Sequence, residues 1–341
     1  MSKLFEIFCV KNLRVRNRIV MPPMCMYCAT DGIASDFHVL HYGAHALGGA
    51  GLVIVEATGV AECGRITDNC LGIYDDAQIP GLARIASAIK ANGATAAVQL
   101  GHAGRKCVAK VPEVIGPSAL SFDPKDAAYR IPRAMDGADI DAAVEAFKNG
   151  ARRAAEAGFE MVEVHGAHGY LLSSFLSPLG NNRNDEYGGS AKNRSRIVGR
   201  VLAAVREAFP GPICLRVSAE DYLPEGNRPA DVAEMINMVK ARGIDIIDVS
   251  SGGVSPAAPP LHPGYQVKFA ETIREISGLP VIAGGLLTSP EHMEEILANG
   301  RADMVFVGRE LLRNPHFPLW AAGKLGAGFP WPKQYERARP R

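Results

Sequence analysis

Short apolar runs, rich in β-branched residues and ended by glycine, proline or polar residues, recur eight times along the chain. Runs of this length and composition predict buried strands. They lie at 18–24, 51–59, 95–104, 161–169, 213–219, 244–253, 280–285 and 303–309. Seven intervening stretches combine helix formers with apolar residues three and four positions apart, which predicts helices. These stretches are 36–48, 80–92, 140–157, 192–208, 230–242, 265–277 and 289–299.

Strands that alternate with helices predict an α/β fold, and eight of them predict a closed (β/α)8 TIM barrel. A doubly wound sheet is the alternative. It normally carries a G-x-G-x-x-G fingerprint after an early strand, which this sequence lacks. We therefore expect one barrel domain over residues 1–341.

Three segments fall outside the alternation. Residues 4–16 predict a short hairpin that closes the bottom of the barrel. Residues 105–136, with four prolines, predict a long irregular insertion after the third strand, and a loop of that length is usually a functional lid. Residues 318–341 predict a C-terminal tail containing proline and glycine.

Composition narrows the class of protein. The chain has 341 residues, a net charge of +1 and 47% hydrophobic residues, which is typical of a globular protein. The near-neutral charge gives no electrostatic reason to expect nucleic acid or an anionic membrane as a partner. No apolar run is long enough to span a bilayer, and the N-terminus lacks the features of a signal peptide. The odd count of seven cysteines predicts reduced thiols in a cytoplasmic protein.

Polar residues cluster at the carboxyl ends of the predicted strands, where barrel enzymes place their active sites. Strands 7 and 8 end in Gly284-Gly285 and Gly308-Arg309. Glycines let the backbone approach a ligand, and the arginine adds a fixed charge, so this pair of loops predicts a phosphate site. The alternative is that the glycines only form tight turns.

The fourth strand ends in a second polar group, His165, His168 and Tyr170. Two imidazoles can hold a polarised carbonyl oxygen, and a nearby phenol can give a proton. Zinc binding or loop packing is the alternative. Zinc needs three or four ligands, and no acidic or cysteine partner follows closely, so we expect no metal.

The chain resembles the old yellow enzyme family of flavin-dependent ene-reductases over essentially its whole length, and most closely their thermophilic-like bacterial branch. The stretches that carry the resemblance are "NRIVMPPMCMY" (17–27), "GLVIVEATGV" (51–60), "QLGHAGRK" (99–106), "EVHGAHGYLLSSFLSPLGNNRNDEYGGSAKNR" (163–194), "LRVSAEDY" (215–222), "GRADMVFVGRELLRNP" (300–315) and "QYER" (334–337).

The resemblance implies a non-covalent FMN at the barrel mouth. The phosphate would lie at Gly308 and Arg309, with Gly284 and Gly285 nearby. Arg216 would face flavin N1 and C2=O, where a positive charge stabilises the reduced anion. Gln99 can donate and accept, which suits the pyrimidine edge. The residues expected to line the ring are Pro22, Pro23, Met24, Cys25 and Ala57.

The resemblance also implies a ping-pong reaction. NADPH or NADH reduces the FMN and leaves. An α,β-unsaturated carbonyl or nitro compound, its oxygen held by His165 and His168, then takes a hydride from flavin N5 at Cβ. Tyr170 protonates Cα.

Cys25-Met-Tyr-Cys28 has the C-x-x-C spacing of zinc sites and dithiol redox enzymes. By resemblance, Cys25 instead lies against the flavin and modulates its potential and the fit of the substrate, and Tyr27 hydrogen-bonds the substrate. Cys28 receives no role, and a dithiol switch stays an alternative. Arg337, in the terminal "QYER", is expected to reach a neighbouring subunit's site, which predicts a homodimer or homotetramer. A solvated basic tail is the alternative.

Three other functions remain open at this stage. Another FMN barrel, such as a dienoyl-CoA reductase, would add a cysteine-ligated iron–sulfur segment. A flavin-free isomerase or aldolase acting on phosphorylated sugars would explain the phosphate loops but not Gln99, Arg216 and the histidines together. A non-enzymatic binding module is the third.

Overall fold

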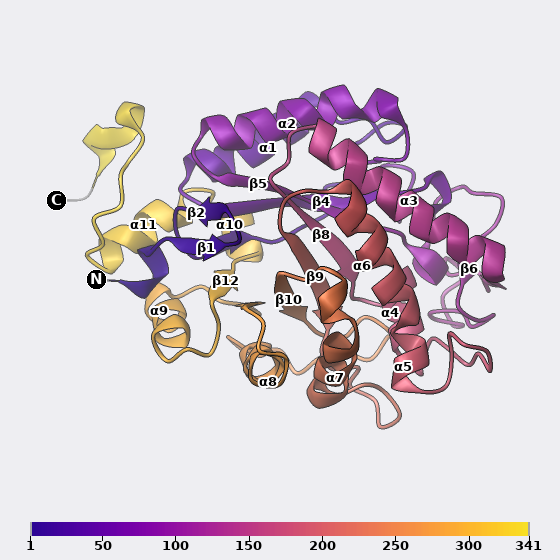
Figure 1. Ribbon diagram of the computed structural model, residues 1–341. Coiled ribbons are helices and arrows are strands. Elements are labelled where there is room, and N and C mark those ends of the chain that lie inside the picture. Colours follow the sequence, from indigo (N-terminus) through magenta and orange to yellow (C-terminus); the bar gives the residue numbers. More distant parts are fainter. Residues whose placement is uncertain (1, 340–341) are drawn as a thin grey trace.

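Eight parallel strands close into a barrel in the computed structural model, which describes residues 2–339 (Figure 1). Around the barrel they are β3 (Ile19–Met21), β4 (Leu52–Gly59), β5 (Thr95–Gly101), β8 (Met161–Gly166), β9 (Ile213–Ser218), β10 (Ile246–Ser250), β11 (Val281–Ala283) and β12 (Met304–Phe306). The pairing of Val305 with Ile19 joins β12 to β3 and closes the ring. Each strand falls within one of the eight predicted runs, which confirms the (β/α)8 barrel.

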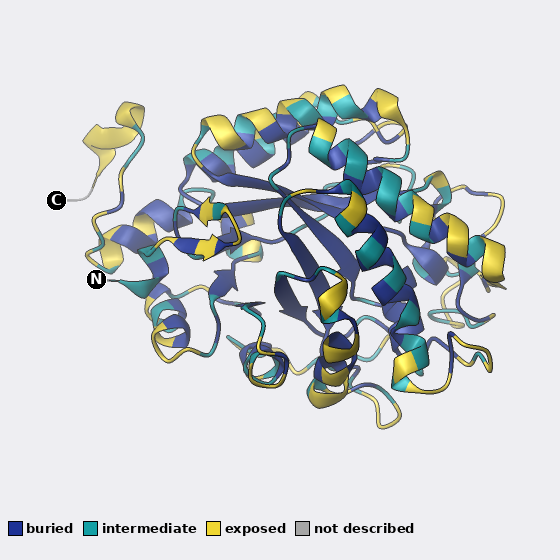
Figure 2. Ribbon diagram, viewed as in Figure 1, coloured by how far each residue is buried: buried dark blue, intermediate teal, exposed yellow. Residues whose placement is uncertain are grey.

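The barrel strands are buried along their whole length because both of their faces are covered (Figure 2). One apolar cluster fills the barrel interior. It contains Val20, Leu52, Ile54, Met161 and Ile246. A larger cluster lies between the strands and the surrounding helices. Hydrophobic burial on both faces therefore holds the strand ends in a fixed ring.

The helical layer follows the predicted order. One helix follows each of the first seven barrel strands: α1 (Asp36–Leu47), α2 (Ile79–Ala91), α3 (Gly137–Glu156), α6 (Arg196–Ala208), α7 (Pro229–Val239), α8 (Val267–Ser277) and α9 (Pro290–Ala298). Side-chain caps fix several starts. The Asp136 carboxylate accepts from the Asp139 N–H, and the Ser289 hydroxyl accepts from the His292 N–H.

Three regions of the helical layer differ from the sequence-based expectation. The predicted helix 192–208 is two helices, α5 (Ala191–Arg194) and α6, with Ser195 between them. A short helix, α4 (Leu171–Leu176), follows β8 and was not predicted. After β12 come α10 (Arg309–Arg313) and α11 (Phe317–Lys324), which were not predicted, so the expected tail from residue 318 begins within a helix.

The additional segments lie at the two ends of the barrel. The hairpin of β1 (Phe8–Val10) and β2 (Leu13–Val15) packs Phe8 and Val10 into the interior cluster, which confirms the predicted bottom closure. The insertion holds only a 3-10 turn, η4 (Gly104–Lys106), and a parallel pair, β6 (Ile115–Gly116) and β7 (Arg133–Ala134).

Five 3-10 turns complete the secondary structure: η1 (Lys3–Phe5), η2 (Glu62–Gly64), η3 (Asp76–Gln78), η5 (Lys240–Arg242) and η6 (Lys333–Ala338). The segment that carries η6 projects away from the barrel beyond α11 (Figure 1). Across residues 2–339, no helix is long and apolar enough to cross a membrane.

Candidate active site

The turn after β8 places three polar side chains at the barrel mouth. His165 lies at the end of the strand. The chain then reverses through His168 at φ 61° and Gly169 at φ 72°, and Tyr170 caps α4. A Cβ on Gly169 would lie 2.3 Å from the Gly253 carbonyl oxygen, so this turn requires glycine for space as well as for conformation.

The rings of these three residues are in contact. The His165 centroid lies 5.3 Å from that of His168 and 4.9 Å from that of Tyr170, both edge to face. The structure thus brings together the three residues that the sequence predicted as an oxygen-binding and proton-donating group.

Both histidines are neutral donors. Burial and the charge of Arg216 lower their pKa values well below the usual range. His165 Nδ1 accepts from the Ala167 N–H at 3.3 Å, so its proton lies on Nε2. His168 Nε2 lies 2.7 Å from the Ser250 hydroxyl oxygen, which also accepts from Gln266 Nε2. The neutral His168 ring keeps one N–H.

Tyr170 is a neutral phenol because burial raises its pKa well above the usual range. The predicted insertion packs against it through an apolar cluster of Ala103, Cys107, Ala109, Val111 and Val114. The insertion therefore forms one wall of the site.

Lys106 is a site residue that sequence reasoning missed. Its Nζ donates to the carbonyl oxygens of His168 (2.9 Å) and Gly253 (3.0 Å) and lies 5.2 Å from the Tyr170 ring centroid. Burial and the charge of Arg105 lower its pKa to about 8. The only available signal was its place in "QLGHAGRK", directly after the strand end.

A cavity of about 220 Å³ opens beside this group, and most of the predicted cofactor residues line it. They are Pro22, Pro23, Met24, Arg216, Gly285, Gly308 and Arg309, with Tyr265 and Gln266 from the start of α8. One observation fits a flavin in this cavity. Arg216 lines it, and its ion pair with Asp248, 3.2 Å from Nε to Oδ2, leaves the other two guanidinium nitrogens for a ligand.

The remaining predicted cofactor residues lie elsewhere around the mouth. Gly284 packs against the Phe306 ring, where a Cβ would lie 2.3 Å away, and it does not line the cavity. Ala57 lines a smaller recess together with His165 and Tyr170. Gln99 is buried within the barrel, and its Nε2 donates to Glu163 Oε1 at 2.8 Å.

Cys25 and Tyr27 lie on the loop after β3. Burial first, then the nearby charge of Glu56, raises the pKa of the Cys25 thiol far above its usual range, which makes it a poor nucleophile. Tyr27 has φ 54° and is 46% exposed. All seven cysteines, including Cys28, are free thiols.

Buried Glu56 holds this loop in place. Its Oε2 accepts from the Met26 N–H at 2.9 Å, and its Oε1 accepts from the Tyr42 hydroxyl at 3.0 Å. His38 Nε2 lies 3.6 Å from Oε1. Burial raises the pKa of Glu56 from 4.5 to about 7. The loop that carries Cys25 therefore depends on a carboxyl that titrates near neutral pH.

Arg337 lies on η6, exposed, in the segment that projects from the barrel (Figure 1). The described fold thus does not bring Arg337 into this chain's own site. No group of three or more histidines, cysteines or acids within residues 2–339 is arranged to hold a metal ion.

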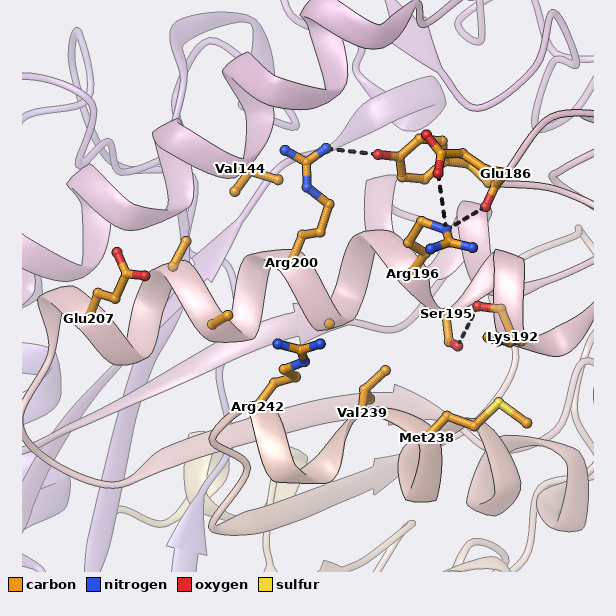
Figure 3. Close-up of a pocket in the computed structure, with 14 residues that line it drawn as sticks. Val144, Glu186, Lys192, Ser195, Arg196, Arg200, Glu207, Met238, Val239 and Arg242 are labelled. Atoms are coloured by element: carbon orange, nitrogen blue, oxygen red, sulfur yellow. Dashed lines mark hydrogen bonds and ion pairs between the residues drawn. The ribbon is translucent and has the colours of Figure 1, made fainter.

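A larger groove of about 770 Å³ lies in the outer helical layer, along both sides of α6 (Figure 3). Arg196 and Arg200 point to one side of the helix, and Met238 and Arg242 face it from the other. None of the predicted site residues lines this groove. The candidate site is therefore the barrel mouth.

Comparison with known proteins identifies the family of the chain. The model of the NADH:flavin oxidoreductase / NADH oxidase family matches residues 3–326. A protein named NADPH dehydrogenase from Geobacillus thermodenitrificans is 51% identical over 337 residues, which cover 98% of each chain. Among solved structures, morphinone reductase has a TM-score of 0.81 and 29% identity, covering 96% of this chain and 91% of that one. A 2-naphthoyl-CoA reductase complex has a TM-score of 0.87 and 26% identity, covering 95% and 52%.

The match extends over almost the whole chain, and it sets aside a flavin-free sugar-phosphate barrel and a non-enzymatic binding module. The expected resemblance to the old yellow enzymes is confirmed. The chain is an oxidoreductase and belongs to the NADH:flavin oxidoreductase / NADH oxidase family.

Proposed function

We propose that this enzyme reduces the C=C bond of α,β-unsaturated carbonyl or nitro compounds. The observation that carries the proposal is the contact between two neutral imidazoles and a neutral phenol, beside a cavity lined by Arg216 and Arg309. FMN bound in that cavity would supply the hydride-transfer chemistry, with NADPH or NADH as the reductant. The name NADPH dehydrogenase of the Geobacillus relative supports NADPH as the reductant.

The residues around the cavity suit the parts of FMN. Arg309 and the backbone at Gly285 and Gly308 would hold the phosphate, because glycine permits close approach and arginine supplies paired donors. Arg216 would face the flavin edge that gains negative charge on reduction. Gln99 retains Oε1 and one N–H for the pyrimidine edge after donating to Glu163.

His165 and His168 would hold the substrate's carbonyl or nitro oxygen. Each neutral ring has one N–H, which lies on Nε2 in His165, and hydrogen bonds with the Ala167 N–H and the Ser250 hydroxyl hold the two rings in place. Neutral, preorganised donors stabilise charge that develops on an oxygen, and one such donor is worth about 100- to 1,000-fold in rate. Tyr27, exposed at the mouth, would add a third contact to the substrate.

Tyr170 would deliver the proton to Cα. Its high pKa keeps the phenol protonated at neutral pH, and general acids of this kind contribute about 100- to 10,000-fold. The apolar wall from the insertion packs against Tyr170. Cys25 would modulate the flavin potential as a neutral thiol. Arg337 would complete the site of a neighbouring subunit, in a dimer or tetramer.

The test replaces Tyr170 with Phe and measures the two half-reactions separately by anaerobic stopped-flow absorbance. Tyr170→Phe keeps the ring contact with His165 and removes only the proton donor. We expect reoxidation by cyclohexenone to slow about 100-fold or more, with reduction by NADPH nearly unchanged. Tyr74→Phe, whose hydroxyl donates to the Asp31 carbonyl oxygen, is the matched control. Equal losses in both half-reactions would refute the proton-donor role.

A further inference from the structure

Five polar side chains continue inward from the mouth on four neighbouring strands. They are Gln99 on β5, Glu163 on β8, Cys214 and Arg216 on β9, and Asp248 on β10, and each is at most 6% exposed. Strand register pairs Gln99 with Glu163, Glu163 with Cys214, and Arg216 with Asp248. The five therefore point to one face of the sheet, into the barrel.

The contacts among these side chains raise the question of which carboxyl, Glu163 or Asp248, carries a proton. Glu163 accepts from Gln99 Nε2 at 2.8 Å and from the Cys214 thiol at 3.3 Å. Asp248 Oδ2 lies 3.2 Å from Arg216 Nε. Two carboxyls thus share one cation inside the barrel. Burying an uncompensated charge is costly, so one of the carboxyls is expected to keep its proton.

The proton belongs on Glu163. Burial, and then the negative charge of Asp248, raises the pKa of Glu163. Burial also raises the pKa of Asp248, but Arg216 and a hydrogen bond from Glu163 oppose that rise. Within residues 2–339, Asp248 Oδ1 has no N–H or hydroxyl partner, and Oδ2 has only the ion pair with Arg216 Nε. A proton on the Glu163 carboxyl would give Asp248 a further donor.

We propose that Glu163 is a positioning residue that works as a neutral carboxylic acid, orienting Gln99 by accepting from it and orienting Arg216 by donating to Asp248. The inference rests on the proposed flavin site, because Gln99 and Arg216 are the residues assigned to the flavin's pyrimidine edge. The network carries no net charge when Arg216 is positive, Asp248 negative and Glu163 neutral. Ionised Glu163 would add a negative charge on the side of the site where reduced FMN also becomes negative.

Two substitutions separate a neutral acid from an ionised one. Glu163→Gln keeps an acceptor for Gln99 and provides an N–H donor for Asp248, so it imitates the protonated state. Glu163→Met removes both functions at similar volume. We expect the FMN Kd of Glu163→Gln to stay within about threefold of wild type, and that of Glu163→Met to rise about tenfold or more. Glu160→Gln, just before β8, is the control.

Apoprotein fluorescence titration with FMN gives the Kd, and spectroelectrochemistry gives the midpoint potential. Glu163→Met is expected to shift the potential by about 30 mV or more, the two-electron equivalent of a tenfold difference between oxidised and reduced FMN binding. Loss of FMN affinity in Glu163→Gln as large as in Glu163→Met would overturn the neutral-acid proposal. An unchanged Kd and potential in both would overturn the positioning role.

Infrared difference spectroscopy of wild type against Glu163→Gln, without flavin, tests the proton directly. A carboxylic acid C=O band that shifts in D₂O and is missing from Glu163→Gln supports the proposal, and absence of that band refutes it. This readout is independent of the proposed function. If wild-type protein bound no FMN, the flavin site would fail, while the infrared band would still decide whether Glu163 is protonated.

Discussion

Replacing Glu56 with Gln tests whether a buried carboxyl makes the loop of Cys25 sensitive to pH. The folded-state pKa of Glu56 is about 7, against 4.5 as its ordinary value. The folded protein therefore binds this proton more tightly than the unfolded chain does. Stability from Glu56 is fully present below pH 4.5 and is lost as pH rises through 7.

The size of the loss follows from the two pKa values. Between them the free energy of unfolding falls by about 1.36 kcal/mol per pH unit, and the total is about 3.4 kcal/mol. From pH 5 to pH 8 the integrated loss is about 2.5 kcal/mol. Glu56→Gln retains an acceptor for the Met26 N–H but does not titrate, so it lacks this loss.

The assay is urea unfolding of the FMN-saturated enzyme at pH 5, 6, 7 and 8. We expect the stability of wild type relative to Glu56→Gln to fall by about 2.5 kcal/mol across this range. Glu225→Gln, at an exposed glutamate, is the control and should follow wild type at each pH. Parallel pH profiles of stability for wild type and Glu56→Gln would show that the Glu56 proton does not contribute to the pH dependence.

Three further predictions concern the cavity, the thiol and the tail. Arg309→Ala should weaken FMN binding about 10- to 100-fold in fluorescence titrations. The affinity for riboflavin, which lacks the phosphate, should stay unchanged. Equal losses of affinity for both ligands would contradict a phosphate role for Arg309. Cys25 should be alkylated by iodoacetamide at pH 8 more slowly than exposed Cys28, as followed by peptide mass spectrometry, because its raised pKa leaves little thiolate; faster reaction of Cys25 would contradict this. Truncation before Gln334 should lower kcat/KM for cyclohexenone, as should Arg337→Ala in the full chain; unchanged enone kinetics would refute the intersubunit role.

The barrel was predictable from the sequence because burial on both faces gives each strand a continuous apolar run. Strand ends were less predictable. The predicted run 161–169 extends beyond β8, which ends at Gly166. The strand stops there because His168 and Gly169 adopt left-handed φ values, which no apolar pattern records. Helix α4 was missed since all six of its residues are buried, so it has no polar face to set a period. Helix α11 was not predicted because it contains Pro318 and Gly323, two residues that are unfavourable in helices.

The site residues at strand ends were predictable because parallel strands place them at one rim. Lys106 was not, because its contacts with the His168 and Gly253 carbonyls arise from the folding of the insertion across two other loops. Glu163 and Asp248 offered a signal that could have been used, since each is an acid with an apolar residue on either side within a strand. A buried acid in that position requires a partner or a proton.

The central claim, that FMN in the barrel mouth passes a hydride from a nicotinamide to an enone, is tested most directly by anaerobic visible-absorbance titration. The purified enzyme is titrated with NADPH and then with cyclohexenone. We expect flavin bands that bleach with NADPH and return with the enone. Bands that bleach but return only with oxygen would contradict the ene-reductase function, and absence of a flavin band after addition of FMN would contradict the flavin site itself.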